Sequence, residues 1–343
     1  MTHVPPTTRR PSRTERLREA LRSRLDPVKV SGVVFHGVLR TLKRAMQSAG
    51  YTWEERAHGA TRLGLWRNAF RQVPAPRRLV CVPGFGDSPV SWLPVFTALS
   101  PVLRRHFDEI VFVDLPGFAG WLSKEDPFTS MDGLLQAIDD LMQELTPHTV
   151  FGHSLGGWLM GHAASAATRQ RSSGWQGPQR VVLACPAGLF ESDEARQLWE
   201  EKFRRTLTQG FASFRGEVFA SEPVWFGLLV PEFERFMSHP GTQAFMNSIE
   251  PRHLLTSRLG TLASDVWLIF AERDSLAPVE RLPAWREALS AASGAIHSVV
   301  ISGSGHSPQL EKPAVTMAVL GQILAGRTPV HRQHSRGRFY AVK

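Results

Sequence analysis

The fold is decided by the stretch Phe151-Gly152-His153-Ser154-Leu155-Gly156-Gly157, residues 151–157 of the 343-residue chain. It ends an apolar run at 148–152 and leads into a stretch of apolar and small residues, which predicts a strand, a sharp turn and a helix. Such a turn needs glycine on both sides of the serine, because a Cβ at Gly152 or Gly156 would collide with the neighbouring strand or helix. The serine is then held in a strained conformation with its hydroxyl exposed. Ser154 is therefore the candidate nucleophile.

A serine hydroxyl is a poor nucleophile and needs a base, which in turn needs a carboxylate to orient it. His306 lies just after the last predicted strand, and Asp274 lies directly after the strand predicted at 265–270. The order Ser154, Asp274, His306, with each group at the carboxyl end of its own strand, predicts a catalytic triad. Asp274 alone could instead be a turn residue or a helix cap. Three other acids near strand ends stay open as the carboxylate: Glu272, Asp193 and Glu194.

Two backbone N–H groups are needed to stabilise the negative oxygen that forms on the attacked carbonyl. One is expected from Leu155, directly after the nucleophile. The other is expected from Phe85, because glycines on both sides let the backbone of the loop 83–88 approach a substrate. The chain contains no G-x-G-x-x-G, H-E-x-x-H or C-x-x-C motif, so no cofactor and no metal site are predicted.

Hydrophobic residues make up 42% and charged residues 21% of the chain, which is the composition of an ordinary globular protein. The net charge of +9 belongs to the two ends. Residues 1–46 carry eleven Lys or Arg against three Asp or Glu, and residues 327–343 carry five basic residues and no acid, which leaves a net −4 for residues 47–326. Neither basic end has a recognisable nucleic-acid-binding module or interleaved aromatic residues, so nucleic acid is not an expected partner.

Two helices are predicted in the first fifty residues. The first starts near Ser12 and ends at Asp26-Pro27, and the second carries apolar residues at helical spacing from Val34 to Met46. The second helix either packs on the body of the protein or forms a basic amphipathic anchor on an anionic membrane surface. Its opposite face carries three basic residues: Arg40, Lys43 and Arg44.

The two cysteines, Cys81 and Cys185, each lie in an apolar, β-branched run and are predicted to be small buried residues of central strands without a disulfide. No apolar run is long enough for a transmembrane helix, and the start of the chain has no convincing secretion signal. The cytoplasm is therefore the expected location, with peripheral contact at the inner face of the membrane if residues 1–46 bind lipid.

Strand and helix patterns alternate along most of the chain, which predicts an α/β fold with a mainly parallel eight-stranded sheet and helices on both faces. A hairpin is predicted at 52–67, and the interval 190–262, rich in Phe, Trp and Leu, breaks the alternation as an inserted helical cap would. The other strands are predicted at 78–82, 109–114, 148–152, 180–185, 265–270 and 296–301. The expected domains are a basic helical N-terminal extension at 1–50, a core at 51–189 and 263–326, a cap at 190–262 and a basic C-terminal tail at 327–343.

Taken together, these motifs resemble the α/β-hydrolase superfamily over about residues 50–325. The resemblance implies an α/β-hydrolase fold, a serine hydrolase, and a structural role for Asp114. Ser154 distinguishes the chain from the similar epoxide hydrolases and haloalkane dehalogenases, which have Asp at this position. Pro83 departs from the histidine that many members have before the glycine. The quoted motifs are Pro83-Gly84-Phe85-Gly86, Val113-Asp114-Leu115-Pro116-Gly117-Phe118, the Ser154 turn, the Asp274 and His306 loops, and Cys185-Pro186-Ala187-Gly188-Leu189, which is similar to monoacylglycerol-lipase-like members.

The expected reaction is the hydrolysis of carboxylic esters, with monoacylglycerols or similar lipids as candidate substrates, through an acyl-enzyme on Ser154. Alternatives that use the same triad are C–C bond hydrolysis and a cofactor-free perhydrolase. A non-catalytic binding protein on this fold is also open, although the intact triad counts against it. Five apolar residues of the predicted cap would suit an acyl chain or form the cap's own core: Phe219, Trp225, Phe226, Leu228 and Leu229.

Overall fold

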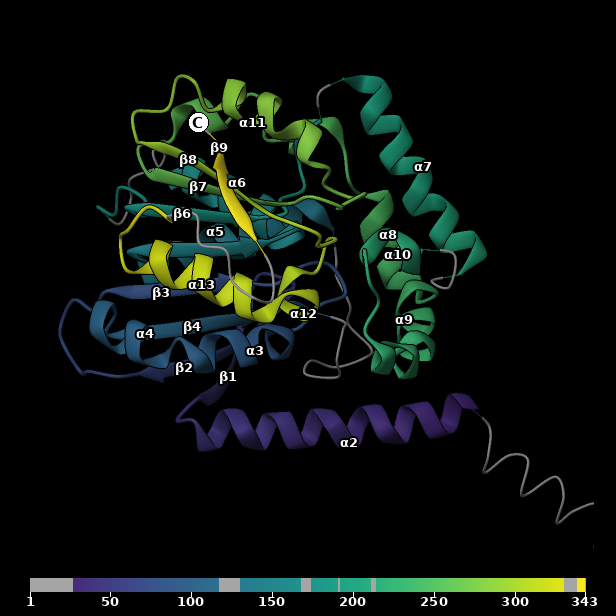
Figure 1. Cartoon of the computed structure of the whole chain (residues 1–343). Coiled ribbons are helices and arrows are strands. Elements are labelled where there is room, and N and C mark those ends of the chain that lie inside the picture. The colour runs from purple at the N-terminus through teal and green to yellow at the C-terminus, as the bar shows by residue number, and fades with distance from the viewer. Residues whose placement is uncertain are drawn as a thin grey trace, which may run out of the picture.

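The computed structural model describes residues 27–116, 130–167, 174–190, 192–210, 214–329 and 338–342. These residues form an α/β fold around a nine-stranded sheet (Figure 1). Neighbouring strands from β4 to β8 are parallel, and the remaining pairs at the two edges are antiparallel. The helix predicted to start near Ser12 lies outside the described residues. In spatial order the strands are β1 (Thr52–His58), β2 (Thr61–Ala69), β4 (Glu109–Asp114), β3 (Arg78–Val82), β5 (Thr149–His153), β6 (Arg180–Ala184), β7 (Asp265–Ala271), β8 (Ile296–Ile301) and β9 (Phe339–Val342).

The predicted fold class is confirmed. The sheet has nine strands in the described residues, one more than the eight that the sequence predicts. The ninth strand, β9, comes from the segment that the charge pattern assigns to a basic tail. It pairs antiparallel with β8, and its Phe339 is fully buried in the hydrophobic cluster that also contains Val319 and Ile301. Four residues after a run of arginines are too few to show the alternating pattern of a strand, so the sequence gives little sign of this pairing.

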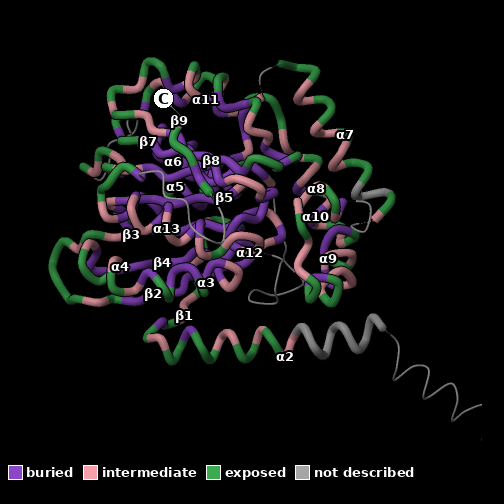
Figure 2. Tube along the Cα trace, in the orientation of Figure 1, coloured by how far each residue is buried: buried purple, intermediate pink, exposed green. Residues whose placement is uncertain are grey.

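Both faces of the sheet are covered, because successive side chains of each strand point to opposite sides. On β3, Leu79 and Cys81 pack into one hydrophobic cluster, and Val80 and Val82 pack into the other. Figure 2 shows the buried strands enclosed between the helical layers. The first face is covered by α3 (Pro89–Ala98), α4 (Ser100–His106) and α13 (Pro313–Leu324), and the second by α5 (Met131–Leu145), α6 (Leu155–Ala167) and α11 (Leu282–Ala288), while the short helices η5 (Val279–Arg281) and α12 (Pro308–Glu311) follow β7 and β8.

The strand order reverses between β3 and β5, because the chain runs outward from β3 to β4 and then returns to the other side of β3. Loops that follow the two strands at such a reversal leave in opposite directions and open a crevice at the carboxyl ends of the strands. Ser154 directly follows β5, and Gly84 and Phe85 follow β3. The reversal therefore places the candidate nucleophile and the candidate oxyanion loop at one crevice.

The interval between β6 and β7 is mostly helical and lies beyond the end of the sheet, on the right in Figure 1. Its aromatic side chains pack into the same hydrophobic cluster as α5 and α6. Its elements are α7 (Asp193–Gln209), α8 (Arg215–Val218), η2 (Val224–Leu228), α9 (Val230–Met237), α10 (Pro240–Asn247), η3 (Pro251–His253) and η4 (Leu259–Thr261). We refer to residues 190–262 as the insertion.

The second predicted N-terminal helix is present as α2 (Pro27–Ser48). It runs along the lower side of the molecule in Figure 1, where it contacts α9 and η2 of the insertion and α3 of the core. Within the described ranges, no helix combines the length and the apolar character that crossing a bilayer requires. The contacts of α2 with α9, η2 and α3 show that this helix packs on the body of the protein, which is one of the two arrangements that its sequence allows.

Candidate active site

Ser154 occupies the turn between β5 and α6 with a left-handed backbone, φ 53°. A Cβ on Gly152 would lie 2.2 Å from the main-chain oxygen of Gly156, and a Cβ on Gly156 would lie 2.1 Å from that of Val82. Neither position has room for a side chain, so close contact between three backbone segments fixes the turn. The same packing holds Ser154 in a conformation that non-glycine residues rarely adopt, with the positive end of the α6 dipole beside it.

Ser154, His306 and Asp274 are joined by two hydrogen bonds in series. Oγ of Ser154 lies 2.8 Å from Nε2 of His306, and Nδ1 of His306 lies 2.8 Å from Oδ2 of Asp274. The amides of Leu276 and Ala277 each donate to Oδ1 of Asp274 at 2.9 Å. Burial by itself raises the pKa of Asp274, but the charge of His306, the hydrogen bond to it and the two amides outweigh burial and hold this pKa below its usual value. The ionised carboxylate therefore orients the Nδ1–H tautomer of His306, which leaves Nε2 to accept the serine proton.

The other three acids that the sequence leaves open have different partners. Glu272 accepts the amide of Gly303 at 2.7 Å and so supports the histidine loop from outside. Asp193 and Glu194 begin α7, where the Asp193 side chain is 83% exposed and lies 3.4 Å from Nε of Arg196. The structure therefore brings Asp274 to His306 and leaves these three acids apart from it.

The candidate oxyanion loop lies against the nucleophile. A Cβ on Gly84 would lie 3.2 Å from Cβ of Ser154, so this glycine gives the loop its close approach. Phe85 turns its ring into the insertion, where it stacks on Phe245 with ring centroids 5.9 Å apart and contacts Phe236 at 5.1 Å. Leu155 is the first residue of α6, and the first amides of a helix have no partner within it. The backbones of Phe85 and Leu155 thus flank Ser154 from two elements.

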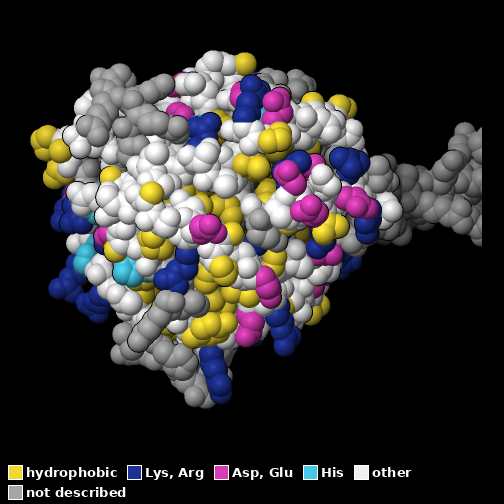
Figure 3. Space-filling view, turned by 90° about the horizontal axis from the view of Figure 1, so that it is seen from above, with side chains coloured by type: hydrophobic (Ala, Val, Ile, Leu, Met, Phe, Trp, Pro, Cys, Tyr) yellow, Lys and Arg dark blue, Asp and Glu magenta, His cyan; other side chains and the backbone are white. Residues whose placement is uncertain are grey.

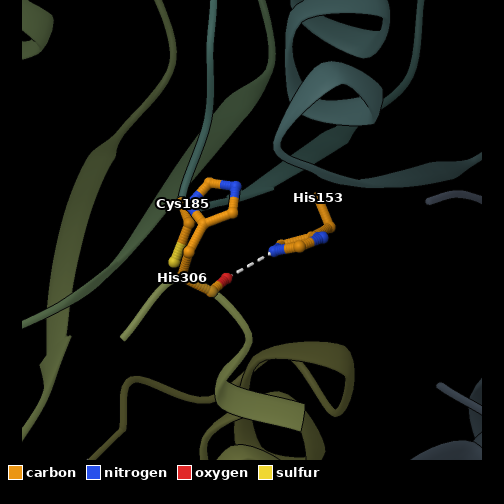
Figure 4. Close-up of side chains that lie close together, drawn as sticks. All are labelled: His153, Cys185 and His306. Atoms are coloured by element: carbon orange, nitrogen blue, oxygen red, sulfur yellow. Dashed lines mark hydrogen bonds between the residues drawn. The ribbon is translucent and has the colours of Figure 1, made fainter. Parts of the chain in front are cut away.

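His153 ties the serine turn to the histidine loop. Its Nε2 donates to the main-chain oxygen of His306 at 2.8 Å, drawn as a dashed line in Figure 4, while its ring lies 5.1 Å from that of His306. Burial, followed by the charge of His306, lowers the pKa of His153 to about 3, so the ring is neutral at ordinary pH. His153 is therefore an uncharged support for the loop that carries the candidate base, His306.

Cys185 completes the group of side chains in Figure 4. Its thiol lies with His153 and His306 in a cluster whose potential metal-binding atoms are all within 4.8 Å of one another. Both ring nitrogens of His306 are already bonded to Ser154 and Asp274, so a metal here would have to break the hydrogen-bonded series. Burial and the nearby charge of Asp274 raise the pKa of the Cys185 thiol well above its usual value, which keeps it protonated. We interpret the cluster as packing behind the site.

The cysteine predictions hold in part. Cys81 and Cys185 are both buried and unpaired, as expected. Cys81 lies within β3, but β6 ends at Ala184, one residue before Cys185. Cys185 has φ 43° and donates its amide to the Ile269 carbonyl at 2.7 Å, so it occupies a left-handed turn that the β-branched run before it does not reveal.

Two further carboxyl groups lie near the site, and neither is expected from the sequence to act in it. Asp87 lies within the oxyanion loop and accepts hydrogen bonds from the amide of Ser88 at 2.7 Å and from the hydroxyl of Ser91 at 2.9 Å. Burial raises the pKa of Asp87 to about 6. Asp114 ends β4 fully buried, and burial together with the charge of Asp87 raises its pKa well above the usual value. Asp114 therefore favours the neutral form more than an exposed aspartate does, and it is not part of the hydrogen-bonded series of Ser154, His306 and Asp274.

A cavity of about 480 Å³ opens at Ser154 and His306, which is within the usual range of small-molecule pockets, roughly 300–1,000 Å³. Its walls are mainly apolar and come from α2, from the oxyanion loop with α3, from the insertion, and from the segments that follow β7 and β8. The contribution of α2, through Val38, Leu39 and Leu42, is not predicted from the sequence. The apolar stripe of this helix predicts that one face is buried. The neighbouring sequence does not indicate which segment of the protein packs against that face.

The five apolar residues singled out in the insertion all line the cavity. Phe219 and Phe226 are also buried against each other, with ring centroids 4.6 Å apart, and belong to the main hydrophobic cluster. Trp225 and Leu228 remain about half exposed. The two interpretations of these residues are therefore not exclusive, because the aromatic core of the insertion is also the wall of the cavity.

A family model described as the alpha/beta hydrolase family matches residues 79–319, which is more than half of the chain. The chain belongs to the alpha/beta hydrolase family. The match leaves α2 and the β1–β2 hairpin outside the family model. No curated protein matches the sequence.

Several solved structures of this family's fold are similar to the chain. A membrane phospholipase A, described as a bacterial virulence factor, has a TM-score of 0.65 and 20% identity over 90% of this chain and 98% of its own. A putative lipase from Acinetobacter baumannii has a TM-score of 0.63 and 17% identity over 85% and 96%. A carboxylesterase from Bacillus subtilis has a TM-score of 0.62 and 18% identity over 86% and 99%. At such identities the likeness supports the fold alone.

Proposed function

We propose that this member of the alpha/beta hydrolase family is a serine hydrolase of carboxylic esters with apolar acyl groups. The observation that carries the proposal is the hydrogen-bonded series Ser154–His306–Asp274 opening into an apolar cavity of about 480 Å³. A nucleophile, a base and a fixed carboxylate in this order are what acyl transfer needs. An apolar cavity beside them favours a substrate that carries a hydrocarbon group.

The proposed reaction has two steps. Oγ of Ser154 attacks the ester carbonyl carbon while Nε2 of His306 takes the serine proton, and the amides of Phe85 and Leu155 stabilise the negative oxygen. The tetrahedral intermediate expels the alcohol, which receives the proton from His306. Water then attacks the acyl-enzyme with His306 again accepting a proton, and the acid leaves as Ser154 regains its hydrogen.

The finer proposal is that the ester is a lipid, with monoacylglycerols as the favoured class. The acyl chain would lie between the aromatic residues of the insertion and the apolar residues of α2, which all line one cavity. We propose the insertion as the cap of the enzyme, with residues 51–189 and 263–326 as its core. The phospholipase and lipase among the similar structures are consistent with a lipid substrate on this fold.

A membrane partner is part of the same proposal. Residues 1–46 carry a large excess of basic residues, and such segments are attracted to anionic lipid surfaces. Peripheral contact at the inner face of the membrane, with the rest of the protein in the cytoplasm, stays a prediction. Vesicle sedimentation of the full chain against a chain that lacks residues 1–26 tests it, because that truncation leaves α2 in place.

The proposal is tested by hydrolysis of p-nitrophenyl esters of increasing acyl length and by release of glycerol from monoacylglycerols. Ser154→Ala is expected to lower kcat by about 10⁴- to 10⁶-fold. A fluorophosphonate should label Ser154 of the wild type, as read by mass spectrometry, and should leave Ser154→Ala unlabelled. The matched control is Ser248→Ala, because Ser248 lies in the insertion away from the triad and bonds to the amide of Met131. Ester turnover that is equal in wild type and Ser154→Ala would refute the proposal, and cleavage of β-diketones instead of esters would favour C–C hydrolysis.

A further inference from the structure

Four large hydrophobic side chains are exposed together beside the cavity. Val38 of α2 is 47% exposed, and Val224, Trp225 and Leu228 of η2 are 101%, 49% and 54% exposed. The helix α2 and the turn η2 are in contact, and Val38, Trp225 and Leu228 also line the cavity. We call these four residues the apolar rim; three of them line the cavity, and Val224 adjoins them in η2. Elsewhere in the described part of the chain, exposed large hydrophobic residues are dispersed: Val73, Leu198 and Tyr340.

The charges around the apolar rim favour an anionic partner. Arg40 and Arg44 are exposed on α2, and the sequence of this helix contains four basic residues and no acid. The acids nearest the rim on the insertion are matched by basic residues, since Glu222 pairs with Arg215 and Glu232 pairs with Arg235. The helix that contributes Val38 to the rim therefore carries an excess of positive charge.

The opposite side of the molecule is different. Figure 3 shows basic and acidic side chains interspersed toward the right of that face, over α7. Pairs such as Arg196 with Glu200, at 2.5 Å, account for this mixture. Leu198 is exposed on the same helix and does not line the cavity at Ser154. The rim therefore differs from the exposed surface of α7, where acidic and basic side chains are interspersed.

We propose that the apolar rim docks the protein on an anionic lipid–water interface, with the mouth of the cavity facing the acyl chains. Tryptophan with neighbouring aliphatic residues is favoured at the boundary between lipid tails and headgroups, and exposed arginines beside it attract anionic headgroups. Docking in this orientation lets an acyl chain pass from the lipid layer to the cavity without crossing water, where each methylene is unfavourable. The role of this docking in substrate delivery rests on the proposed lipid-ester substrate. The location of the docking surface rests on the exposed side chains of the apolar rim.

The test uses the full chain with Val224→Asp, because Val224 is fully exposed and does not line the cavity. Leu198→Asp is the matched control, as it places the same charge on an exposed aliphatic position of α7. Binding is measured by sedimentation with phosphatidylglycerol–phosphatidylcholine vesicles on the Ser154→Ala background, so that hydrolysis cannot alter the lipid. Hydrolysis of a short, soluble ester is measured separately with Ser154 intact.

Val224→Asp is expected to weaken vesicle binding at least about tenfold, because an aspartate is strongly unfavourable in the apolar layer. Leu198→Asp should change binding less than about twofold, and neither variant should change turnover of the soluble ester. Binding of the unsubstituted protein should weaken on pure phosphatidylcholine and at high salt, since anionic headgroups contribute. Equal loss in both variants, or no loss in Val224→Asp, would overturn the docking surface. Rim-dependent binding without any ester hydrolysis would support docking and refute the proposed function.

Discussion

Nε2 of His153 donates a hydrogen bond of 2.8 Å to the main-chain oxygen of His306. The residue before the candidate nucleophile thus holds the loop that carries the candidate base, across 153 positions of sequence. Because both residues are buried, the donor cannot be replaced by bulk water. The position of the His306 loop relative to Ser154 therefore depends on this buried donor.

The pKa of His153 makes this contact sensitive to acid. With a folded-state pKa of about 3 against an ordinary 6.5, the unfolded chain holds more protons than the folded chain between these values. The free energy of unfolding contributed by His153 is therefore complete above pH 6.5 and falls as the pH decreases, by at most about 1.4 kcal/mol per pH unit. His153→Gln should be less stable at pH 7 by about 1–3 kcal/mol and should lose less stability toward pH 4. Urea denaturation at several pH values measures both effects, and parallel pH curves for the two proteins would show that His153 does not titrate in this way.

Asp274→Asn and Glu272→Gln separate the two acids of one loop. The first removes the charge that orients His306 and should lower kcat by about 10⁴-fold, the size of the effect in a comparable triad. The second weakens only the bond to the amide of Gly303 and should lower kcat less than about tenfold. Steady-state kinetics on one ester suffices. A larger loss in Glu272→Gln than in Asp274→Asn would identify Glu272 as the functional carboxylate.

Gly156→Ala tests the steric basis of the serine turn. The new Cβ would lie 2.1 Å from the main-chain oxygen of Val82, so the turn must distort, and we expect a loss of at least about 3 kcal/mol in unfolding free energy. Gly37→Ala in α2 is the control, because a Cβ there meets nothing within 4 Å and an alanine favours a helix by about 0.5–1 kcal/mol. Thermal denaturation of both variants gives the comparison. A stable, active Gly156→Ala protein would contradict the described packing.

Leu42→Trp tests whether α2 contacts the acyl group. A larger side chain on this wall of the cavity should exclude long chains first, so the ratio of kcat/KM for long to short esters should fall at least about tenfold. Leu198→Trp adds the same ring on the exposed face of α7 and should leave that ratio unchanged. An unaltered chain-length profile in Leu42→Trp would show that the acyl group lies elsewhere.

Local sequence patterns predicted most strands of the sheet and the order of Ser154, Asp274 and His306 along the chain. Apolar strands predicted at 78–82, 109–114 and 296–301 are present with the same bounds, because buried parallel strands need continuous apolar runs that can be recognised from neighbours alone. The spacing of Gly152, Ser154 and Gly156 likewise predicts a turn whose conformation depends on contacts within a few residues and one adjacent strand.

Contacts between distant segments were decided only by the tertiary structure. The sequence favoured Asp274 and left Glu272 open, and the structure separates them because Asp274 contacts the ring of His306 whereas Glu272 contacts only the backbone of Gly303 in the same loop. The sequence also could not predict that α2 packs against the insertion. An amphipathic pattern indicates that one face of a helix is buried, but it does not identify the segment that packs on this face. The strand β9 depends on the free edge of β8, which exists only once the sheet has formed. Chemistry carried by residue type and short spacing is therefore readable from this sequence, whereas the shape of the cavity arises from long-range packing.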